Sequence, residues 1–475
     1  MATARTTART MARTTARTMP RTMARPRGAS TLVPHMQRIV ITGMGWVNPL
    51  ANNVEDTWRA LLAGKSGMGP ISRFDASTFK TNFAAEVKAF KLGAFLPDPD
   101  AHRDAGLNAQ FALAAAAQAV SQAKLDKKVV NRRRFGIYLG SGEGTLDFDN
   151  YSATHIASWN DATRAVDGRK WVEAAYKLMV PARETEQEAN MTISHVAWEF
   201  GCGGPASNCL TACAASIQAI GEAFELMRRG DADVMLAGGA HTMVHPLGVT
   251  GFIRLTAMST RNDDPTHAAR PFDQTRDGFV MGEGAGIVVL ETLDHAKSRG
   301  ANILGEVCGY GSSADAYRIT DMHPDGKGPL AAMMLALHQA SIDPAEPMAD
   351  GRPPIQYIAA HGTGTKENDK IETAAVKRAF GPLAPRIPLS SIKSMMGHLI
   401  AAAGVSNVIS ALKAIETGML PPTMNYSTPD ANLDLDYIPN ASRDMRPLGG
   451  VQSCLCNSYG FGGQNDALVV RGPQA

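Results

Sequence analysis

From residue 37 onward, short runs of apolar and β-branched residues alternate with longer helical segments. The strand-like runs lie at 38–42, 135–139, 233–237, 286–290, 355–360, 451–456 and 467–471, and the helical segments lie at 57–62, 106–124, 212–229, 329–341 and 397–416. Strands that are continuously apolar are typical of a sheet buried on both faces. Their alternation with helices predicts an α/β fold built in layers, and 475 residues suffice for a large core.

The charge balance excludes several classes of protein. Lys and Arg number 47 against 45 Asp and Glu, so neither a strongly basic nucleic-acid binder nor an acidic disordered chain is expected. No apolar run approaches the roughly 18 residues that span a membrane, which predicts a soluble protein. The six cysteines follow neither a disulfide nor a zinc spacing, and no signal peptide leads the chain. Reduced thiols in the cytoplasm are therefore expected.

Residues 1–36 differ from the rest of the chain. They repeat variations on Ala-Arg-Thr and contain seven Arg but no Lys, Asp or Glu. Such a segment has little to bury, so we expect a disordered low-complexity tail. A tag, a transit-type leader and a misassigned start codon remain open as its origin.

Cys213 is the first candidate for a reactive group. It falls where Thr211-Ala212-Cys213-Ala214-Ala215-Ser216 opens an amphipathic helix. Free N–H groups in a first helical turn favour a thiolate, which is the form a nucleophile needs. A small, buried and inert cysteine is the alternative, and it is the commoner fate of a single cysteine.

Two histidines strengthen the catalytic interpretation. His361 follows a predicted strand and precedes Gly362, whereas His398 follows Gly397 at the start of a predicted helix. With Cys213 they indicate a shared pocket, although a protease or a thiol transferase would use the same residue types. His241 and His245 have a spacing suited to a metal, but Pro246 interrupts them and no third ligand is evident, so no metal is expected.

Several longer motifs carry a family resemblance. In chain order they are Thr211-Ala212-Cys213, Arg270-Pro271-Phe272-Asp273, Gly282-Glu283-Gly284-Ala285-Gly286, His361-Gly362-Thr363-Gly364-Thr365, Lys393-Ser394-Met395-Met396-Gly397-His398 and Cys456-Asn457-Ser458-Tyr459-Gly460-Phe461-Gly462-Gly463. From about residue 38 to 470 the chain resembles the β-ketoacyl-[acyl-carrier-protein] synthases. It is most similar to the type II elongating enzymes (KAS II-like) of fatty-acid and polyketide biosynthesis.

The resemblance implies a thiolase fold: two similar βαβαβαββ halves stacked as an α-β-α-β-α sandwich. The halves would be 37–300, with the nucleophile, and 301–475, with the catalytic histidines. It also implies a homodimer, or a heterodimer with a chain-length partner.

The resemblance further implies an acyltransferase whose substrates ride on the phosphopantetheine of an acyl-carrier protein, without a metal or other cofactor. Cys213 would take the acyl group, and His361 and His398 would stabilise the enolate formed when malonyl-carrier protein loses CO₂. Lys393, paired directly with Glu372, would support the electrostatics of the site.

The remaining implied roles concern the substrate pocket. The backbone N–H groups of Cys213 and Phe461 would form the oxyanion hole, and the Phe461 ring would gate the acyl pocket beside Phe279. Thr363 and Thr365 match positions that contact the phosphopantetheine arm.

Two alternatives remain beside an elongating enzyme. A non-elongating chain-length partner usually lacks the nucleophile, so the presence of Cys213 with both histidines argues against it. A thiolase acting on coenzyme A esters would need a different arrangement of Cys and His near the C-terminus.

The segment 140–205 is longer than expected, which predicts either a restricted set of acyl chains or a surface loop without effect. Arg103 and Arg254 are candidates for docking an acidic carrier protein.

Overall fold

Ten strands form one hydrogen-bonded sheet in the order β12-β11-β15-β16-β10-β1-β9-β8-β4-β7. The computed structural model describes residues 36–126, 130–319 and 321–473, so the expectations for the tail lie outside the described residues, Met36 apart. The strands of this sheet are β1 (Ile39–Val47), β4 (Phe135–Ser141), β7 (Ala206–Cys209), β8 (Val234–His241), β9 (Gly284–Thr292), β10 (Gly305–Ala314), β11 (Tyr357–Ala359), β12 (Leu389–Ser390), β15 (Ser453–Gly460) and β16 (Gln464–Arg471).

Short two-stranded pairs lie outside the sheet. They are β2 (Gly69–Pro70) with β3 (Phe83–Ala84), β5 (Trp159–Asn160) with β6 (Ala165–Val166), and β13 (Met419–Leu420) with β14 (Arg443–Asp444). The helices are α1 (Val54–Leu62), α2 (Leu107–Ala123), α3 (Phe148–Ala157), α4 (Gly168–Leu178), α5 (Pro181–Thr185), α6 (Met191–Phe200), α7 (Ala215–Arg228), α8 (Pro246–Arg254), α9 (Leu293–Ser298), α10 (Lys327–Gln339), α11 (Lys366–Phe380), α12 (Lys393–Met396) and α13 (Ala403–Thr417).

The sheet consists of two groups of strands with the same topology. The order β1-β9-β8-β4-β7 in one group corresponds to β10-β16-β15-β11-β12 in the other. In each group the first two pairings are antiparallel and the last two are parallel. Antiparallel pairing of β1 with β10 joins the two groups. Each group follows a βαβαβαββ order along the chain, with α2, α6 and α7 in the first and α10, α11 and α13 in the second.

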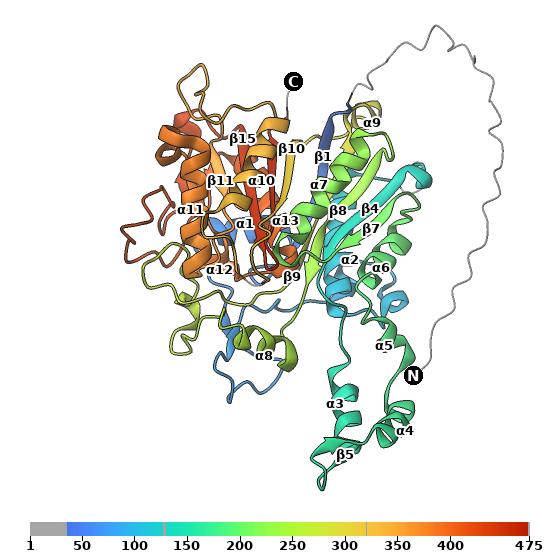
Figure 1. Cartoon of the computed structure of the whole chain (residues 1–475). Helices are drawn as coiled ribbons and strands as arrows, with labels where there is room; N and C mark the ends of the chain where they lie inside the picture. Colours follow the sequence, from blue (N-terminus) through green and yellow to red (C-terminus); the bar gives the residue numbers. More distant parts are fainter. Residues whose placement is uncertain (1–35, 127–129, 320, 474–475) are drawn as a thin grey trace, which may run out of the picture. The chain divides into compact units, whose positions relative to one another are not determined.

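The helices form three layers around the strands (Figure 1). Helices α2 and α6 pack on the outer face of the first group, and α10 and α11 on that of the second. Helices α7 and α13 contact each other and strands of both groups, so they form the central layer. The predicted α-β-α-β-α thiolase fold is confirmed.

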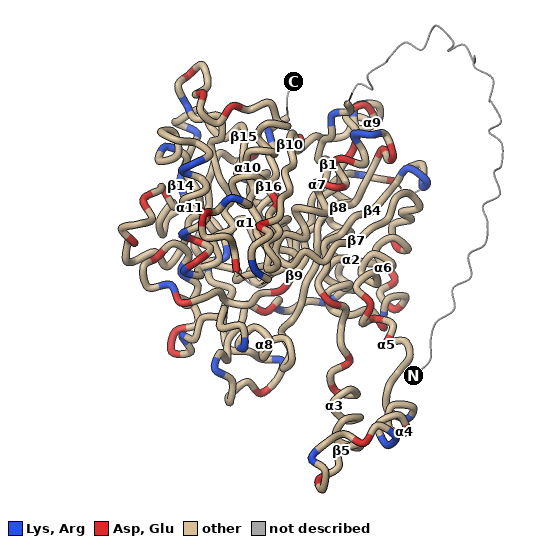
Figure 2. The backbone as a smooth tube through the Cα atoms, viewed as in Figure 1, with Lys and Arg blue, Asp and Glu red and all other residues tan. Residues whose placement is uncertain are grey.

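Close packing of α2 on β1 depends on two glycines. A Cβ at Gly43 would lie 2.1 Å from the carbonyl oxygen of Ala119, and one at Gly45 would lie 1.9 Å from that of Ala115. These distances are too short for any side chain, so the small residues on both elements allow the helix to approach the strand. Charged residues lie mostly at the periphery, and the strands are largely uncharged (Figure 2).

The long segment between β4 and β7 forms an arm. Helices α3 and α4 pack on each other, and with β5 they extend away from the sheet (Figure 1). No residue of α4 is buried, and several apolar side chains on the arm are exposed, Tyr176 at 89%. Among the described residues, no helix is long and apolar enough to cross a membrane.

Candidate active site

Cys213 lies in a single 3₁₀ turn, Ala212–Ala214, directly before α7. The sequence-based expectation had placed it inside the first turn of the α-helix. The difference has a backbone cause: Ala212 adopts a φ of +48°, a conformation that interrupts a regular helix. Strained backbone of this kind is common at functional sites. The Ser458 hydroxyl fixes the turn by donating a hydrogen bond to the Cys213 carbonyl at 2.6 Å.

The charge state of Cys213 differs from the expectation. Burial raises the pKa of its thiol to about 12, so the prediction of a resting thiolate is wrong. The Lys393 cation and the backbone N–H groups of Phe461 and Cys213 lower this pKa, but burial outweighs them. Both N–H groups therefore act on the sulfur, where a reacting carbonyl would also lie.

His398 contacts the thiol directly. Its Nε2 lies 3.0 Å from the Cys213 Sγ, and its Nδ1 accepts a hydrogen bond from the Ile400 N–H at 3.1 Å. Burial, together with the Lys393 cation, holds the pKa of His398 well below its usual value, so the ring is neutral. A neutral ring whose Nδ1 accepts carries its proton on Nε2. His398 therefore presents an N–H donor at the thiol.

His361 lies beside His398 just after β11. Their ring centroids are 5.5 Å apart, and the Tyr459 ring lies 5.5 Å from that of His361. Burial, with the nearby Lys393 cation, lowers the pKa of His361 well below its usual value. Its Nδ1 is buried and has no hydrogen-bond partner among the residues that the structure describes. Two neutral imidazoles thus face the same region as the thiol.

Lys393 and Glu372 hold the backbone of His361 from two sides. The Lys393 Nζ donates to the His361 carbonyl at 2.6 Å, whereas Glu372 accepts from the His361 N–H at 2.9 Å and from the Gly362 N–H at 2.8 Å. The expected direct pairing of Lys393 with Glu372 is not present: the carboxylate is occupied by backbone N–H groups and Asn457. Burial lowers the pKa of Lys393 to about 8, while Glu372 opposes this shift.

The ligand-type atoms of Cys213, His361 and His398 lie within 4.8 Å of one another. Such a cluster has the composition of a metal site. A metal-binding histidine normally donates its other ring N–H to an acceptor. His398 does the opposite, since its Nδ1 accepts from Ile400 and its Nε2 carries the proton. The arrangement suits hydrogen-bond donation better than metal binding.

A cavity of about 860 Å³ leads to these three residues. Its lining also includes Phe279, Phe461, Thr363, Thr365 and Arg254, all named in the sequence analysis. The hydroxyls of Thr363 and Thr365 lie 3.0 Å apart, and Thr365 caps the N-terminus of α11.

The two phenylalanines differ in setting. Phe279 is buried, and its ring lies 5.3 Å from that of His398 in an edge-on arrangement. Phe461 lies in the turn between β15 and β16 and is 37% exposed. The structure thus brings together at one site the residues that the sequence predicted: Cys213, both histidines, Lys393, Glu372, both threonines and both phenylalanines.

Sequence reasoning missed several residues that shape this site. Ser391 donates to the Gly362 carbonyl, and Asn407 donates to the carbonyls of Ala359, Ala360 and Asn457. Ser458 and Tyr459 lie inside the Cys456–Gly463 motif, so proximity to Phe461 was an available signal. Ser391 and Asn407 carried no local signal, because only the three-dimensional fold brings them to His361.

Other sequence candidates lie elsewhere. Arg103 is exposed beside Asp104, and no residue of the arm helices lines the 860 Å³ cavity.

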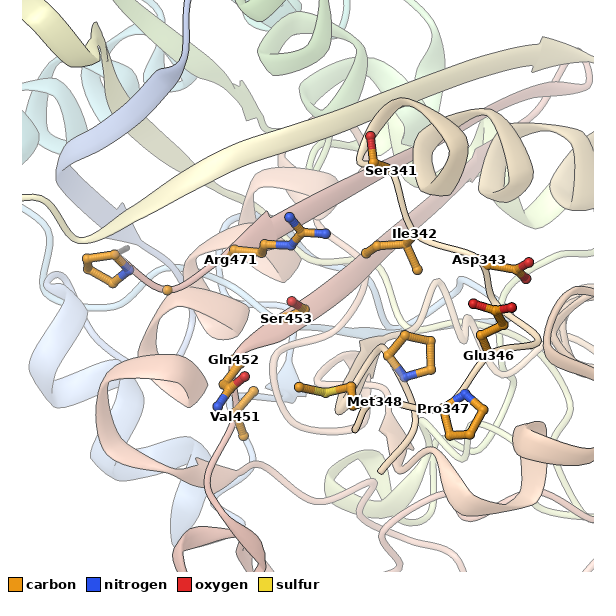
Figure 3. Close-up of a pocket in the computed structure, with 13 residues that line it drawn as sticks. Ser341, Ile342, Asp343, Glu346, Pro347, Met348, Val451, Gln452, Ser453 and Arg471 are labelled. Atoms are coloured by element: carbon orange, nitrogen blue, oxygen red, sulfur yellow. The ribbon is translucent and has the colours of Figure 1, made fainter. Parts of the chain in front are cut away.

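A second cavity of about 590 Å³ lies between the loop after α10 and the ends of β15 and β16 (Figure 3). Its lining includes Asp343, Glu346 and Arg471 but neither Cys nor His.

The fold and the site define a condensing enzyme of the thiolase class. The fold is duplicated and has five layers, and the site combines a buried cysteine at a strained turn with two neutral histidines. The comparisons with known families agree. Residues 36–296 match the β-ketoacyl synthase N-terminal domain, and residues 304–427 match the C-terminal domain. The chain belongs to the β-ketoacyl synthase family.

Relatives match over almost their whole length. The chain is 39% identical over 442 residues to 3-oxoacyl-[acyl-carrier-protein] synthase 2 of Coxiella burnetii, covering 91% of this chain and 98% of the relative. It is 40% identical over 435 residues to the enzyme of the same name from Synechocystis sp., with 92% and 98% covered.

Solved structures agree as well. A ketosynthase in complex with its type II polyketide synthase acyl-carrier protein, bound to a hexaketide, has a TM-score of 0.79 at 32% identity, covering 93% of this chain and all of that one. The ishigamide ketosynthase/chain length factor has a TM-score of 0.79 at 33% identity, covering 92% of this chain and all of that one.

Proposed function

We propose that the protein is an acyltransferase that condenses an acyl group on Cys213 with malonyl-acyl-carrier protein. The product is a β-ketoacyl-carrier protein lengthened by two carbons, as in fatty-acid or polyketide elongation. One observation carries the proposal: the Nε2–H of a neutral His398 points at the Cys213 sulfur, 3.0 Å away, at the end of a cavity.

The first half-reaction transfers the acyl group. The Cys213 sulfur attacks the carbonyl of an acyl-carrier-protein thioester, its proton leaves with the phosphopantetheine thiol, and a new thioester forms on the enzyme. The N–H groups of Cys213 and Phe461 stabilise the oxygen of the tetrahedral intermediate. Support comes from the effect of both N–H groups on the sulfur's pKa.

The second half-reaction breaks and forms carbon bonds. Malonyl-carrier protein loses CO₂, and the electron pair moves into an enolate whose oxygen accepts hydrogen bonds from His361 and His398. The enolate carbon attacks the acyl-Cys213 carbonyl, and the Cys213 sulfur departs. Lys393 and Glu372 hold His361 in position, which their bonds to its backbone support.

The pocket and the partners complete the proposal. Thr363 and Thr365 contact the phosphopantetheine arm, Phe461 gates the acyl pocket beside Phe279, and Arg254 at the cavity contacts the acidic carrier protein. The halves 37–300 and 301–475 supply the nucleophile and the histidines. The enzyme works in the cytoplasm as a dimer, with itself or with a chain-length partner, and needs no cofactor beyond the carried phosphopantetheine.

The test of the transfer step is intact-protein mass spectrometry. Incubation with acyl-carrier proteins should add one acyl mass to the wild type, and peptide mapping should locate it on Cys213. Cys213→Ala should add none. Acyl transfer to a cysteine other than Cys213, or no acyl transfer to the wild type, would overturn the assignment.

A further inference from the structure

His241 is an imidazole without partners in the interior. It ends β8 and is 3% exposed, and neither ring nitrogen has a hydrogen-bond partner among the described residues. Leaving a buried polar group unsatisfied costs about 1–3 kcal/mol. Buried polar groups in native proteins are nearly always paired, so an unpaired imidazole indicates that its partner is a ligand or a water molecule.

Strand register places His241 on the sheet face that carries the active site. Side chains two apart in a strand share a face, so His241 lies on the same face as Gly239. A Cβ at Gly239 would meet the Ala401 carbonyl at 2.7 Å and the Ser216 Cβ at 2.9 Å. Ser216 lies in the first turn of α7, three residues after Cys213, and Ala401 lies in a 3₁₀ turn three residues after His398. The preceding residue, Ala240, packs in the opposite, outer core.

The immediate neighbours leave room for the ring but offer it no bond. A Cβ at Gly142, the residue after β4, would lie 2.3 Å from the His241 Nδ1. A side chain at residue 142 would therefore displace the imidazole from this position. His241 is also near enough to His398 to lower the pKa of that ring.

The surroundings of the thiol are otherwise apolar. Residues that follow His241 join Cys213 in one hydrophobic cluster, which includes Val244, Val249, Met258, Phe279 and Ile400. An acyl chain attached to Cys213 would lie among these side chains. His241 lies two residues before Met243, which packs against this cluster, and is absent from the lining of the open 860 Å³ cavity.

We propose that His241 is a specificity-determining residue: it hydrogen-bonds an oxygen of the acyl chain on Cys213, so the enzyme prefers chains with a hydroxyl or carbonyl to plain alkyl chains. The inference rests on the proposed function and names the substrate class of that site. A pocket built to hydrogen-bond an oxygen discriminates strongly against an analogue that lacks it, because the polar group is then left unpaired.

The test compares acyl-carrier proteins of equal chain length. Hexanoyl-carrier protein is compared with hexanoyl groups that carry a hydroxyl or a keto oxygen at C3, C4 or C5, and the rate of Cys213 acylation is measured by mass spectrometry. We expect at least one oxygenated chain to load about tenfold faster than hexanoyl. His241→Phe should remove most of this preference, and His241→Gln, which keeps a hydrogen-bonding group, should retain part of it.

His338→Phe on the exposed side of α10 serves as the matched control and should leave the ratio unchanged. The melting temperature gives a second readout. His241→Phe should hold or raise the melting temperature, because the substitution removes an unsatisfied buried group. If His241 were instead bound to structural water, the same substitution would lower the melting temperature. Equal loading of all chains, or an unchanged ratio in His241→Phe, would overturn the selectivity. Absence of any acyl adduct would instead overturn the proposed function and this inference with it.

Discussion

The backbone at Ile400 decides which nitrogen of His398 carries the proton. Its N–H points at Nδ1, and its φ of +45° is unusual for a β-branched residue. The conformation thus has a chemical consequence: Nε2 becomes a donor that faces the Cys213 sulfur. Strain held by surrounding structure is a common way to pre-organise a site.

Replacement of His398 should separate the two half-reactions. His398→Ala removes one enolate donor, so decarboxylation of malonyl-carrier protein should fall on the order of 10²-fold. Acyl transfer to Cys213 should remain measurable, because its oxyanion donors are backbone groups. His398→Gln is the control, since its amide N–H can replace part of the donor. Release of CO₂ at the wild-type rate by His398→Ala would contradict the assigned role.

The Lys393 cation should control the reactivity of Cys213. It lowers the pKa of Cys213, so Lys393→Met should slow alkylation of Cys213 by iodoacetamide. Cys202 is an internal control, because burial and Arg132 set its pKa. The pKa of Lys393 is lowered to about 8, so its charge is present below that pH and lost above it.

A pH series tests the sign of this effect. As the pH rises through about 8, the loss of the Lys393 charge should make Cys213 labelling rise less steeply than Cys202 labelling. In Lys393→Met the two slopes should agree. Parallel slopes in the wild type, with no effect of the substitution, would show that Lys393 does not act on the thiol.

At the scale of elements, strands with β-branched apolar runs were predictable and others were not. β1, β4, β8 and β9 overlap the predicted strands, because burial on both faces demands such residues. β10 contains three glycines, and β7 is a short, polar edge strand, so neither has that pattern. The polar helix α11 was missed for the same reason, since charged residues cover its outer face.

Shortening the arm should test whether it is an interface. Removal of residues 159–180 leaves α3 and the buried Ser158 in place and deletes α4, which has no buried residue, so the melting temperature should stay within a few degrees of the wild type. We expect exposed Tyr176 and Trp159 to contact a second chain. Sedimentation should therefore show weaker self-association. An intact dimer would show that the arm contributes nothing to association.

At the scale of the whole molecule, the duplicated fold assembles the site. Cys213 lies in the turn before α7, and His398 lies just before the 3₁₀ turn that leads into α13. These two helices pack together in the central layer. Equivalent helix starts in the two halves therefore meet.

The sequence motifs predicted the residues that the structure brings together at the cavity, Cys213, His361 and His398 among them. The burial that raises the pKa of Cys213 and the partner of Lys393 depend on long-range packing, which no local pattern contains.

The most direct test of the central claim follows the product. Wild-type protein, an acyl-carrier protein loaded with an acyl group, and ¹³C-labelled malonyl-carrier protein are combined, and carrier-bound products are measured by mass spectrometry. We expect a β-ketoacyl-carrier protein longer by two labelled carbons, one labelled CO₂ released per product, and no product from Cys213→Ser. Release of CO₂ without chain extension by the wild type, or full extension by Cys213→Ser, would contradict it.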